Sequence, residues 1–443
     1  MSTDAASGCF VGIDLGTSGC RAIAIGGDAG VLAEARVALP PTRSLPGGGR
    51  EQAPDDWWQA VLAVLDGLHA QGAGPIAALC VDGTSGSILL CDPQGHACGP
   101  ALMYDDTRAS GQAETVAALA PADSPARGTG SALARLLWLL ERAPQAAAHA
   151  VHQADWIAGH LAGRHGHSDE NNCLKLGYDP VSRCWPDWLG ELGIPSGLLP
   201  TVRPVGSVVG AVDPALAGRG GLRRHTLVVA GTTDSNAAAL AAGIERPGDA
   251  VTSLGTTLVL KVLAERPVAS ARYGVYSHRI GDYWLVGGAS NSGGGVLRQH
   301  FTDAELVALS ARIDPDSPRG LGYYPLPGPG ERFPRNDPQL APRLVPRPDD
   351  RAEFLQGMLE GIAEIEAEGY ARLAELGAPP PRRVFSAGGG AVNAAWTRIR
   401  ARRLGIPLLP ARHTEAAYGV ALLARAAILA PAGPGTGSPA ELI

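Results

Sequence analysis

The chain has 443 residues, 45% of them hydrophobic and 18% charged, and its formal net charge is −6. This length and composition predict two or three domains with real hydrophobic cores. The acidic balance argues against a nucleic-acid partner, and no apolar run reaches the roughly 18–20 residues of a membrane helix. We expect no signal peptide, because a basic segment and an apolar core are missing near residue 1. The seven cysteines form no C-x-x-C pair, which predicts reduced thiols in the cytoplasm.

Hydrophobic periodicity predicts the elements of the first half of the chain. In chain order they are strands at 9–14, 20–25, 31–39 and 76–81, and helices at 54–68, 131–142 and 155–161. Residues 180–224 are rich in Pro and Gly and predict an irregular connection.

A second lobe is predicted to begin near Leu227. Eight prolines between 323 and 350 predict a semi-rigid loop with little regular structure. The remaining predicted elements are a long helix at 351–376, a strand, turn and helix at 383–396, and a last helix near 416–424. On the long helix we expect Glu364, Glu366 and Glu368 to be at least partly exposed.

The most informative pattern is a Leu-Gly-Thr core between two apolar, β-branched runs, which occurs at Leu15 and again at Leu254. Each copy predicts a strand, a tight turn and a second strand. Turn amides and hydroxyls can hold phosphate oxygens. Two such hairpins predict duplicated lobes around a nucleotide, with phosphate contacts from Gly16, Thr17, Ser18, Gly255, Thr256 and Thr257.

Carboxylates beside these patterns are the candidate catalytic groups. The sequence lacks the G-x-x-x-x-G-K-[ST] loop, so the phosphate cradle must be built from the hairpins. Asp14 enters the first turn and would face phosphate through Mg²⁺; the alternative is an ordinary surface hairpin. Asp234 follows the apolar run 227–230 and is the better candidate for a catalytic base, although it also suits the start of a helix from Ser235.

A glycine-rich run at 386–391 lies between a predicted strand and a predicted helix. Gly388 and Gly389 would let the backbone pass against a flat ring, Asn393 would read adenine edges, and Trp396 would pack nearby. The alternative is a flexible turn. Lys175 and Lys261 are the only lysines among 37 basic residues, and we interpret them as chance or packing rather than as functional groups.

Taken together, the motifs make the chain similar to the FGGY carbohydrate kinases along nearly its whole length. The matching tracts are 14–18, 82–86, 104–108, 134–139, 155–157, 168–172, 231–234, 253–257, 330–334, 386–391 and 415–419. The resemblance implies an α/β fold of two ribonuclease-H-like (actin-like ATPase) lobes. Each lobe would be a mixed sheet flanked by helices, with a cleft between an N-terminal lobe at 1–225 and a C-terminal lobe at 226–443.

The same resemblance implies roles for individual residues. It implies ATP and Mg²⁺ as cofactors, Asp234 as the general base on the terminal hydroxyl of an open-chain ketose, and Asp14 and Asp234 as metal ligands. Sugar contacts are implied for Asp14, Asp82, Ser85 and Asp234, and an adenine site for Gly389, Asn393 and Trp396.

The substrate is expected to be D-ribulose, phosphorylated to D-ribulose 5-phosphate. Within the family the strings at 80–92, 172–178 and 230–235 resemble a short branch of D-ribulose kinases once labelled xylulokinase-like. Xylulokinases carry Met-His where this chain has Ser85 and Gly86. The alternatives are a kinase for D-xylulose, glycerol or another polyol or ketose, or an actin-like ATPase module that acts on no sugar. We expect a monomer or a homodimer.

Overall fold

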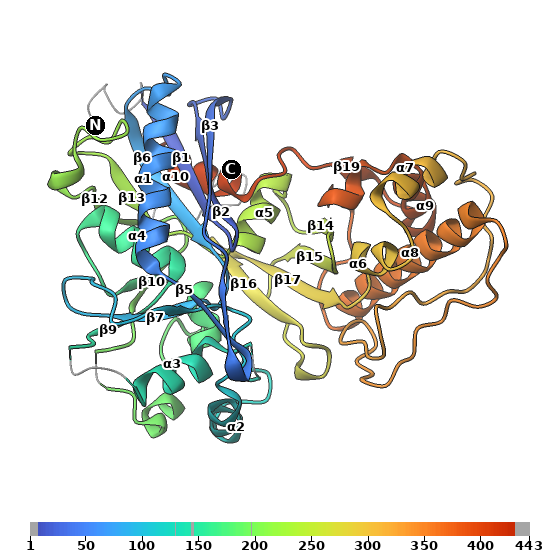
Figure 1. Cartoon of the computed structure of the whole chain (residues 1–443), viewed down its shortest axis with the longest axis horizontal. Helices are drawn as coiled ribbons and strands as arrows, with labels where there is room; N and C mark the ends of the chain where they lie inside the picture. The colour runs from blue at the N-terminus through green and yellow to red at the C-terminus, as the bar shows by residue number, and fades with distance from the viewer. Residues whose placement is uncertain (1–7, 129, 143–145, 196, 430–443) are drawn as a thin grey trace. The chain divides into compact units, whose positions relative to one another are not determined.

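The computed structural model describes residues 8–128, 130–142, 146–195 and 197–429, which fall into two compact units (Figure 1). The first unit holds the chain up to Ala241, the short segment His278–Asp282 and the chain from Glu415. The second holds Ala242–Ser277 and Tyr283–Thr414. This division differs from the predicted boundary at 225/226, because the next strand pairs with the first unit's sheet and a helix from the end of the chain packs on that sheet.

A six-stranded mixed sheet, in the order β12-β13-β6-β1-β2-β3, forms the centre of the first unit. Its strands are β1 (Cys9–Leu15), β2 (Gly19–Ile25), β3 (Val31–Ala38), β6 (Ile76–Gly83), β12 (Val208–Ala211) and β13 (Leu227–Val229). Every residue of β1 is buried, and β1 pairs antiparallel with β2 and parallel with β6. Its nearly unbroken apolar sequence therefore reflects a strand covered on both faces.

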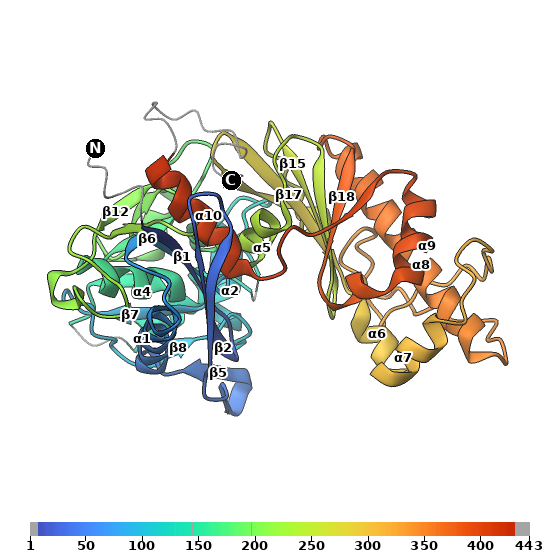
Figure 2. The same ribbon diagram turned by 90° about the horizontal axis from the view of Figure 1, so that it is seen from above.

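Helices cover both faces of this sheet. Figure 2 shows α10 on one face of the central strands, with α1 and α4 on the other. The helices of this layer are α1 (Pro54–Ala70), α4 (Gln153–Ala162), α5 (Asp234–Ala242) and α10 (Ala416–Leu429). A Cβ atom on Gly12 of β1 would lie 1.8 Å from the carbonyl oxygen of Ala417 on α10, so this contact is possible only for glycine.

A smaller five-stranded sheet extends the first unit, in the order β4-β5-β8-β7-β9. Its strands are β4 (Arg43–Leu45), β5 (Gly49–Gln52), β7 (Ile88–Cys91), β8 (Ala101–Leu102) and β9 (His149–His152), with helices α2 (Ser110–Leu119) and α3 (Ala132–Leu140) beside them. β10 (His167–Asp169) and β11 (Thr201–Arg203) form a separate two-stranded parallel sheet. The sequence did not predict α2, because only two of its residues, Ala113 and Val116, are buried apolar side chains.

A second six-stranded sheet, in the order β16-β17-β15-β14-β18-β19, has most of its residues in the second unit. Its strands are β14 (Asp249–Leu254), β15 (Leu258–Ala264), β16 (Tyr276–Ile280), β17 (Tyr283–Ser290), β18 (Arg383–Ala387) and β19 (Leu408–Pro410). Its helices are α6 (Gly294–Arg298), α7 (Asp303–Ser310), α8 (Arg351–Glu375) and α9 (Ala394–Leu404). Within the described ranges, short 3₁₀ helices span 46–48, 172–176, 187–192, 214–216, 271–273 and 389–392.

Local sequence signals account for several of these elements. The two Leu-Gly-Thr hairpins are confirmed as the antiparallel pairs β1–β2 and β14–β15. The long helix α8 is confirmed: the Asp350 side chain accepts a hydrogen bond from the Ala352 amide at its start, and Gly377 has a left-handed φ of 108° just beyond its end. Among the described residues, no helix is long and apolar enough to cross a membrane.

The expectation for the three glutamates of α8 is wrong for one of them. Glu366 is fully buried and forms a two-point ion pair with Arg400 of α9, with Nε–Oε2 and Nη2–Oε1 distances of 2.6 and 2.7 Å. Thr252 of β14 donates a hydrogen bond to the same carboxylate, and Arg400 donates one to Ser386 of β18. This buried cluster ties two strands of the sheet to two helices.

Candidate active site

Three carboxyl groups lie at the ends of neighbouring parallel strands in the first unit. Asp14 at the end of β1 is the register partner of Asp82 at the end of β6. The next strand over, β13, leads to a parallel bridge between Gly83 and Thr233, and Asp234 follows directly. Ligand sites of open α/β sheets lie at the carboxyl ends of the parallel strands, and this edge carries all three predicted acids.

Burial and mutual repulsion set the protonation of this cluster. Asp82 is fully buried, and burial first, then the charges of Asp14 and Asp234, raise its pKa well above the ordinary value. Burial also raises the pKa of Asp14, although Asp82 and the Arg21 guanidinium, 3.3 Å away, oppose that rise. Asp82 is therefore the member of the pair that holds a proton, and Asp14 is the member that keeps its charge.

Asp234 is the most accessible of the three acids. It is only partly buried, it begins α5, and its carboxylate accepts a hydrogen bond of 2.6 Å from the Ser235 amide. The positive end of a helix favours a negative charge at this position. A partly exposed carboxyl group at a strand-to-helix turn is well placed to accept a proton from a bound molecule.

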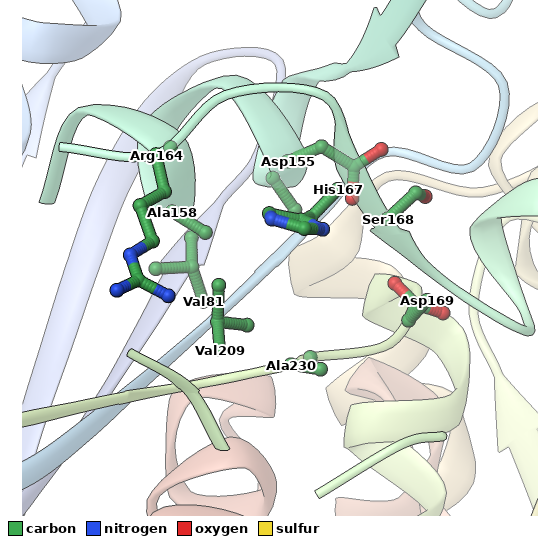
Figure 3. Close-up of a pocket in the computed structure, with 12 residues that line it drawn as sticks. Val81, Asp155, Ala158, Arg164, His167, Ser168, Asp169, Val209 and Ala230 are labelled. Atoms are coloured by element: carbon green, nitrogen blue, oxygen red, sulfur yellow. The ribbon is translucent and has the colours of Figure 1, made fainter. Parts of the chain in front are cut away.

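A buried polar network supports the loop that carries Asp234. The Asn171 amide donates to the Thr232 hydroxyl at 3.0 Å, and Asp169 accepts hydrogen bonds from the backbone amides of Asn171 and Asn172. A small cavity of about 20 Å³ is lined by Asp155, His167 and Asp169, among other residues (Figure 3). A cavity of this volume holds about one water molecule.

Two cations hold the turn that follows β6. The Lys175 ammonium donates to the carbonyl oxygen of Ser85 at 3.3 Å, and the fully buried Arg135 guanidinium donates twice to the carbonyl oxygen of Gly86. Gly86 has a φ of 94°, and a Cβ on it would lie 3.0 Å from Arg135 Nη2 and 3.3 Å from Lys175 Cδ. The turn accepts only glycine at this position.

The sequence interpretation assigned no role to Lys175, which the structure places at the Ser85 turn. Its burial, with the neighbouring Arg135 charge, lowers the pKa of Lys175 to about 8, while the charge of Asp234 opposes that change. The rarity of lysine in an arginine-rich chain was the available signal. The compact Lys175 ammonium bonds the Ser85 turn within electrostatic reach of Asp234, and a planar guanidinium has a different shape.

Hydrogen bonds fix the orientation of two peptide groups in the turn between β1 and β2. Two consecutive carbonyl groups are occupied: Thr17 accepts from Gln52 Nε2 at 2.7 Å and Ser18 accepts from the Leu39 amide at 3.0 Å. In a trans peptide the N–H points opposite to the C=O. The amides of Ser18 and Gly19 therefore point away from Gln52 and Leu39, as a phosphate-holding turn requires.

The turn between β14 and β15 in the second unit uses the same arrangement. Gly255 and Thr256 accept hydrogen bonds from the amides of Gly294 and Gly295 at 2.8 and 2.9 Å. The amides of Thr256 and Thr257 consequently point away from those glycines. A Cβ on Gly295 would lie 2.9 Å from the Thr256 carbonyl oxygen. The absence of side chains at 293–295 therefore lets this backbone approach the turn. The sequence interpretation assigned no role to this glycine run.

A pocket of about 700 Å³ opens beside this second turn, within the second unit. Of the predicted nucleotide-binding residues, it is lined by Gly255, Thr256, Gly389, Asn393 and Trp396. Gly388 is not among its lining residues: it has a φ of 81° and lies under Leu254, whose backbone a Cβ would meet at 2.9 Å. Thr257 is also outside the lining.

The Asn393 side chain is engaged within the protein. Its oxygen accepts from the Trp396 amide at 3.0 Å, as the cap of α9, and its nitrogen donates to the Ser310 hydroxyl at 2.8 Å. Trp396 is buried, and Gly390 packs on its ring. Asn393 and Trp396 thus shape the pocket wall.

Comparison with known proteins identifies the fold and the chemistry. Residues 9–241 match the N-terminal domain of the FGGY family of carbohydrate kinases, and residues 250–428 match its C-terminal domain. The chain belongs to this family. It is therefore an ATP-dependent carbohydrate kinase, and its two units are the two actin-like domains of that family.

Individual relatives agree with this placement. The chain is 30% identical over 432 residues to a xylulose kinase from Streptomyces coelicolor, covering 93% of this chain and 86% of that one. The solved xylulose kinase from Rhodospirillum rubrum has a TM-score of 0.82 at 25% identity and covers 98% of this chain and 92% of that one. Plasmodium falciparum glycerol kinase with ADP shares the fold, with a TM-score of 0.83 at 16% identity, covering 94% of this chain and 89% of that one.

Proposed function

We propose that this kinase phosphorylates the terminal hydroxyl of a pentulose, with D-ribulose as the first candidate. The supporting observation is the row of strand ends that carries Asp14, Asp82 and Asp234 beside the Ser85 turn. Carboxylates and a serine hydroxyl suit the many hydroxyl groups of an open-chain sugar. Gly86, with no room for a side chain, suits a substrate pocket that lacks the imidazole of the Met-His pair in xylulokinases.

In this proposal, Asp234 accepts the proton of the sugar's terminal hydroxyl as that oxygen attacks the terminal phosphorus of ATP. The oxygen–phosphorus bond to the sugar forms, the bond to ADP breaks, and the proton stays on the carboxylate until solvent removes it. The Ser85 turn and Lys175 orient the sugar. The turn amides of Ser18, Gly19, Thr256 and Thr257, together with the Thr17 hydroxyl, hold phosphate oxygens.

Mg²⁺ would be held by Asp14 and Asp234 together with phosphate oxygens, and it would offset the charge of the triphosphate. Within the described residues, no group of three or more His, Cys, Asp or Glu side chains forms a metal site. One or two carboxylates, completed by phosphates and water, are the usual protein contribution to an Mg²⁺ site, so the acids present fit the ion.

D-Xylulose is the second candidate, because xylulose kinases are the relatives at the highest identities quoted above. Measuring kcat/KM for D-ribulose, D-xylulose, ribitol and glycerol, by coupled detection of ADP, tests the proposal. We expect the highest value for D-ribulose. A higher value for D-xylulose would transfer the assignment to the second candidate, and a preference for either polyol would reject a pentulose.

We further propose that the enzyme works in the cytoplasm. All seven cysteines are free, and burial raises the thiol pKa of Cys9 to about 11 and that of Cys91 to about 12. Such thiols are unreactive and suit a reducing compartment.

A further inference from the structure

The nucleotide pocket of the second unit is apolar where a base would lie. One end is the β14–β15 turn with Gly294, which suits phosphate, and the remainder includes the side chains of α7 and of residues 389–396. Val307 and Val392 line it and are 76% and 89% exposed, the two highest values among the exposed large apolar residues. Exposed apolar side chains that face one pocket mark a ligand surface.

Several polar side chains of the same pocket already have partners within the protein. The Asn393 side-chain oxygen accepts a hydrogen bond from the Trp396 amide, and its nitrogen donates one to the Ser310 hydroxyl. Arg298 pairs with Asp303 at 3.3 Å, and both are largely exposed at the rim. The Trp396 indole nitrogen is itself buried, and Gly390 packs on the benzo ring of the same side chain.

Base selection depends on hydrogen bonds to the base edge. A site built to hydrogen-bond one edge rejects the wrong partner by about 10⁴–10⁵-fold, whereas an apolar pocket discriminates far less between ligands of the same shape. Adenine, guanine and hypoxanthine have nearly the same ring size and differ in their edge groups. A pocket that contacts only the ring faces gives them similar binding.

We propose that this pocket recognises a purine by shape and apolar contact, without reading its edge, so that GTP and ITP serve as phosphoryl donors nearly as well as ATP. The inference rests on the proposed function, because it takes this pocket as the nucleotide site. Pyrimidine triphosphates, with a smaller ring, bury less area between the two valines and are poorer donors.

The direct test is kcat/KM for ATP, GTP, ITP and CTP with the intact enzyme at saturating sugar, following formation of the sugar phosphate. We expect GTP and ITP within tenfold of ATP, and CTP lower than all three. A preference for ATP over GTP greater than tenfold overturns the inference while leaving the kinase assignment intact. Absence of sugar phosphate with every nucleotide counts against the proposed function instead.

Two variants separate ring packing from edge reading. Val392→Asp places a charge on the pocket surface that would contact the face of the base. We expect this variant to raise the KM for ATP and the KM for GTP by the same factor, at least tenfold. The KM for sugar should be unchanged. Val181→Asp is the matched control, because this valine is 59% exposed in the first unit. Ser310→Ala is expected to leave the ATP-to-GTP ratio of kcat/KM within threefold of the original. A larger change would show that Ser310 and Asn393 read the base.

Discussion

Asp14 and Asp82 are register partners on adjacent parallel strands, and both carboxyl groups are buried. Two such groups cannot both ionise at neutral pH without a large energetic cost, so the pair carries one proton and one charge. The Arg21 guanidinium lies against Asp14, which places the charge on that side and the proton on Asp82. The pair thus presents one anionic and one proton-donating group at the same strand edge.

The first prediction concerns the general base. Asp234→Asn removes the proton acceptor but keeps the size of the side chain, and we expect kcat to fall by about 10²–10⁴. Nucleotide binding, measured by calorimetry with ADP in the absence of Mg²⁺, is expected to stay unchanged. Sugar phosphorylation near the original rate would exclude Asp234 as the base.

The second prediction concerns the metal. Asp14→Asn removes the charged member of the buried pair, so we expect the Mg²⁺ concentration for half-maximal activity to rise several-fold. Asp28→Asn, at an exposed turn of the same unit, is the control. An unaltered Mg²⁺ dependence in Asp14→Asn would assign the metal to other groups.

The third prediction concerns Lys175. Because hydrogen bonds from charged groups contribute about 1.5–3 kcal/mol, Lys175→Met is expected to raise the KM for sugar by about 10–100-fold, and Lys175→Arg to recover only part of the loss. Burial lowers the pKa of Lys175 to about 8, so kcat/KM for sugar should fall as the pH rises through 8 and the ammonium is lost. The Met variant should lack this alkaline limb. If it keeps the limb, another group is responsible.

The fourth prediction concerns the buried pair of the second unit. Arg400→Met strands the Glu366 carboxylate in the core and is expected to reduce the free energy of unfolding by about 3–5 kcal/mol. Combining it with Glu366→Leu should recover most of that loss. Arg398→Met, on the exposed side of the same helix, should cost less than about 1 kcal/mol in urea unfolding. Equal losses at the two arginines would contradict this assignment.

The fifth prediction concerns acid stability. Burial, with the neighbouring His160 and His149, lowers the pKa of His165 to about 4 in the folded state. The unfolded chain has an ordinary histidine pKa near 6.5, so it binds the proton first as the pH falls, and folding stability decreases between about pH 6.5 and 4. His165→Gln should flatten the dependence of Tm on pH in this window. His225→Gln, at an exposed site, should not.

Local sequence signals predicted much of the fold. The Leu-Gly-Thr turns, the cap at Asp350 and the glycine-rich run after β18 all depend on residues within a few positions of one another. The sequence therefore placed both hairpins and the long helix, and the motif resemblance led to the family that the comparisons confirm.

The relationships that the sequence did not predict are those between distant residues. β13 joins the first sheet because Leu227 pairs with Ala78, and no local pattern indicates that partner. Glu366 is buried because Arg400, 34 positions later, reaches it. The Asn393 side chain caps its own helix and donates a hydrogen bond to Ser310, 83 positions earlier. The expected contact of Asn393 with adenine would compete with these two hydrogen bonds.

The helix α10 closes the first unit, although it is the last element among the described residues. Its backbone touches Gly12 on β1, and its Gly419 lies against Ala237 on α5, so the sheet face is uncovered until residues 416–429 have been synthesised. On the ribosome, the core of the first unit therefore stays unsealed until residue 429 has been translated. A fragment ending at residue 241 would lack that cover and would expose the apolar face of β1 and β6 to chaperones or to aggregation.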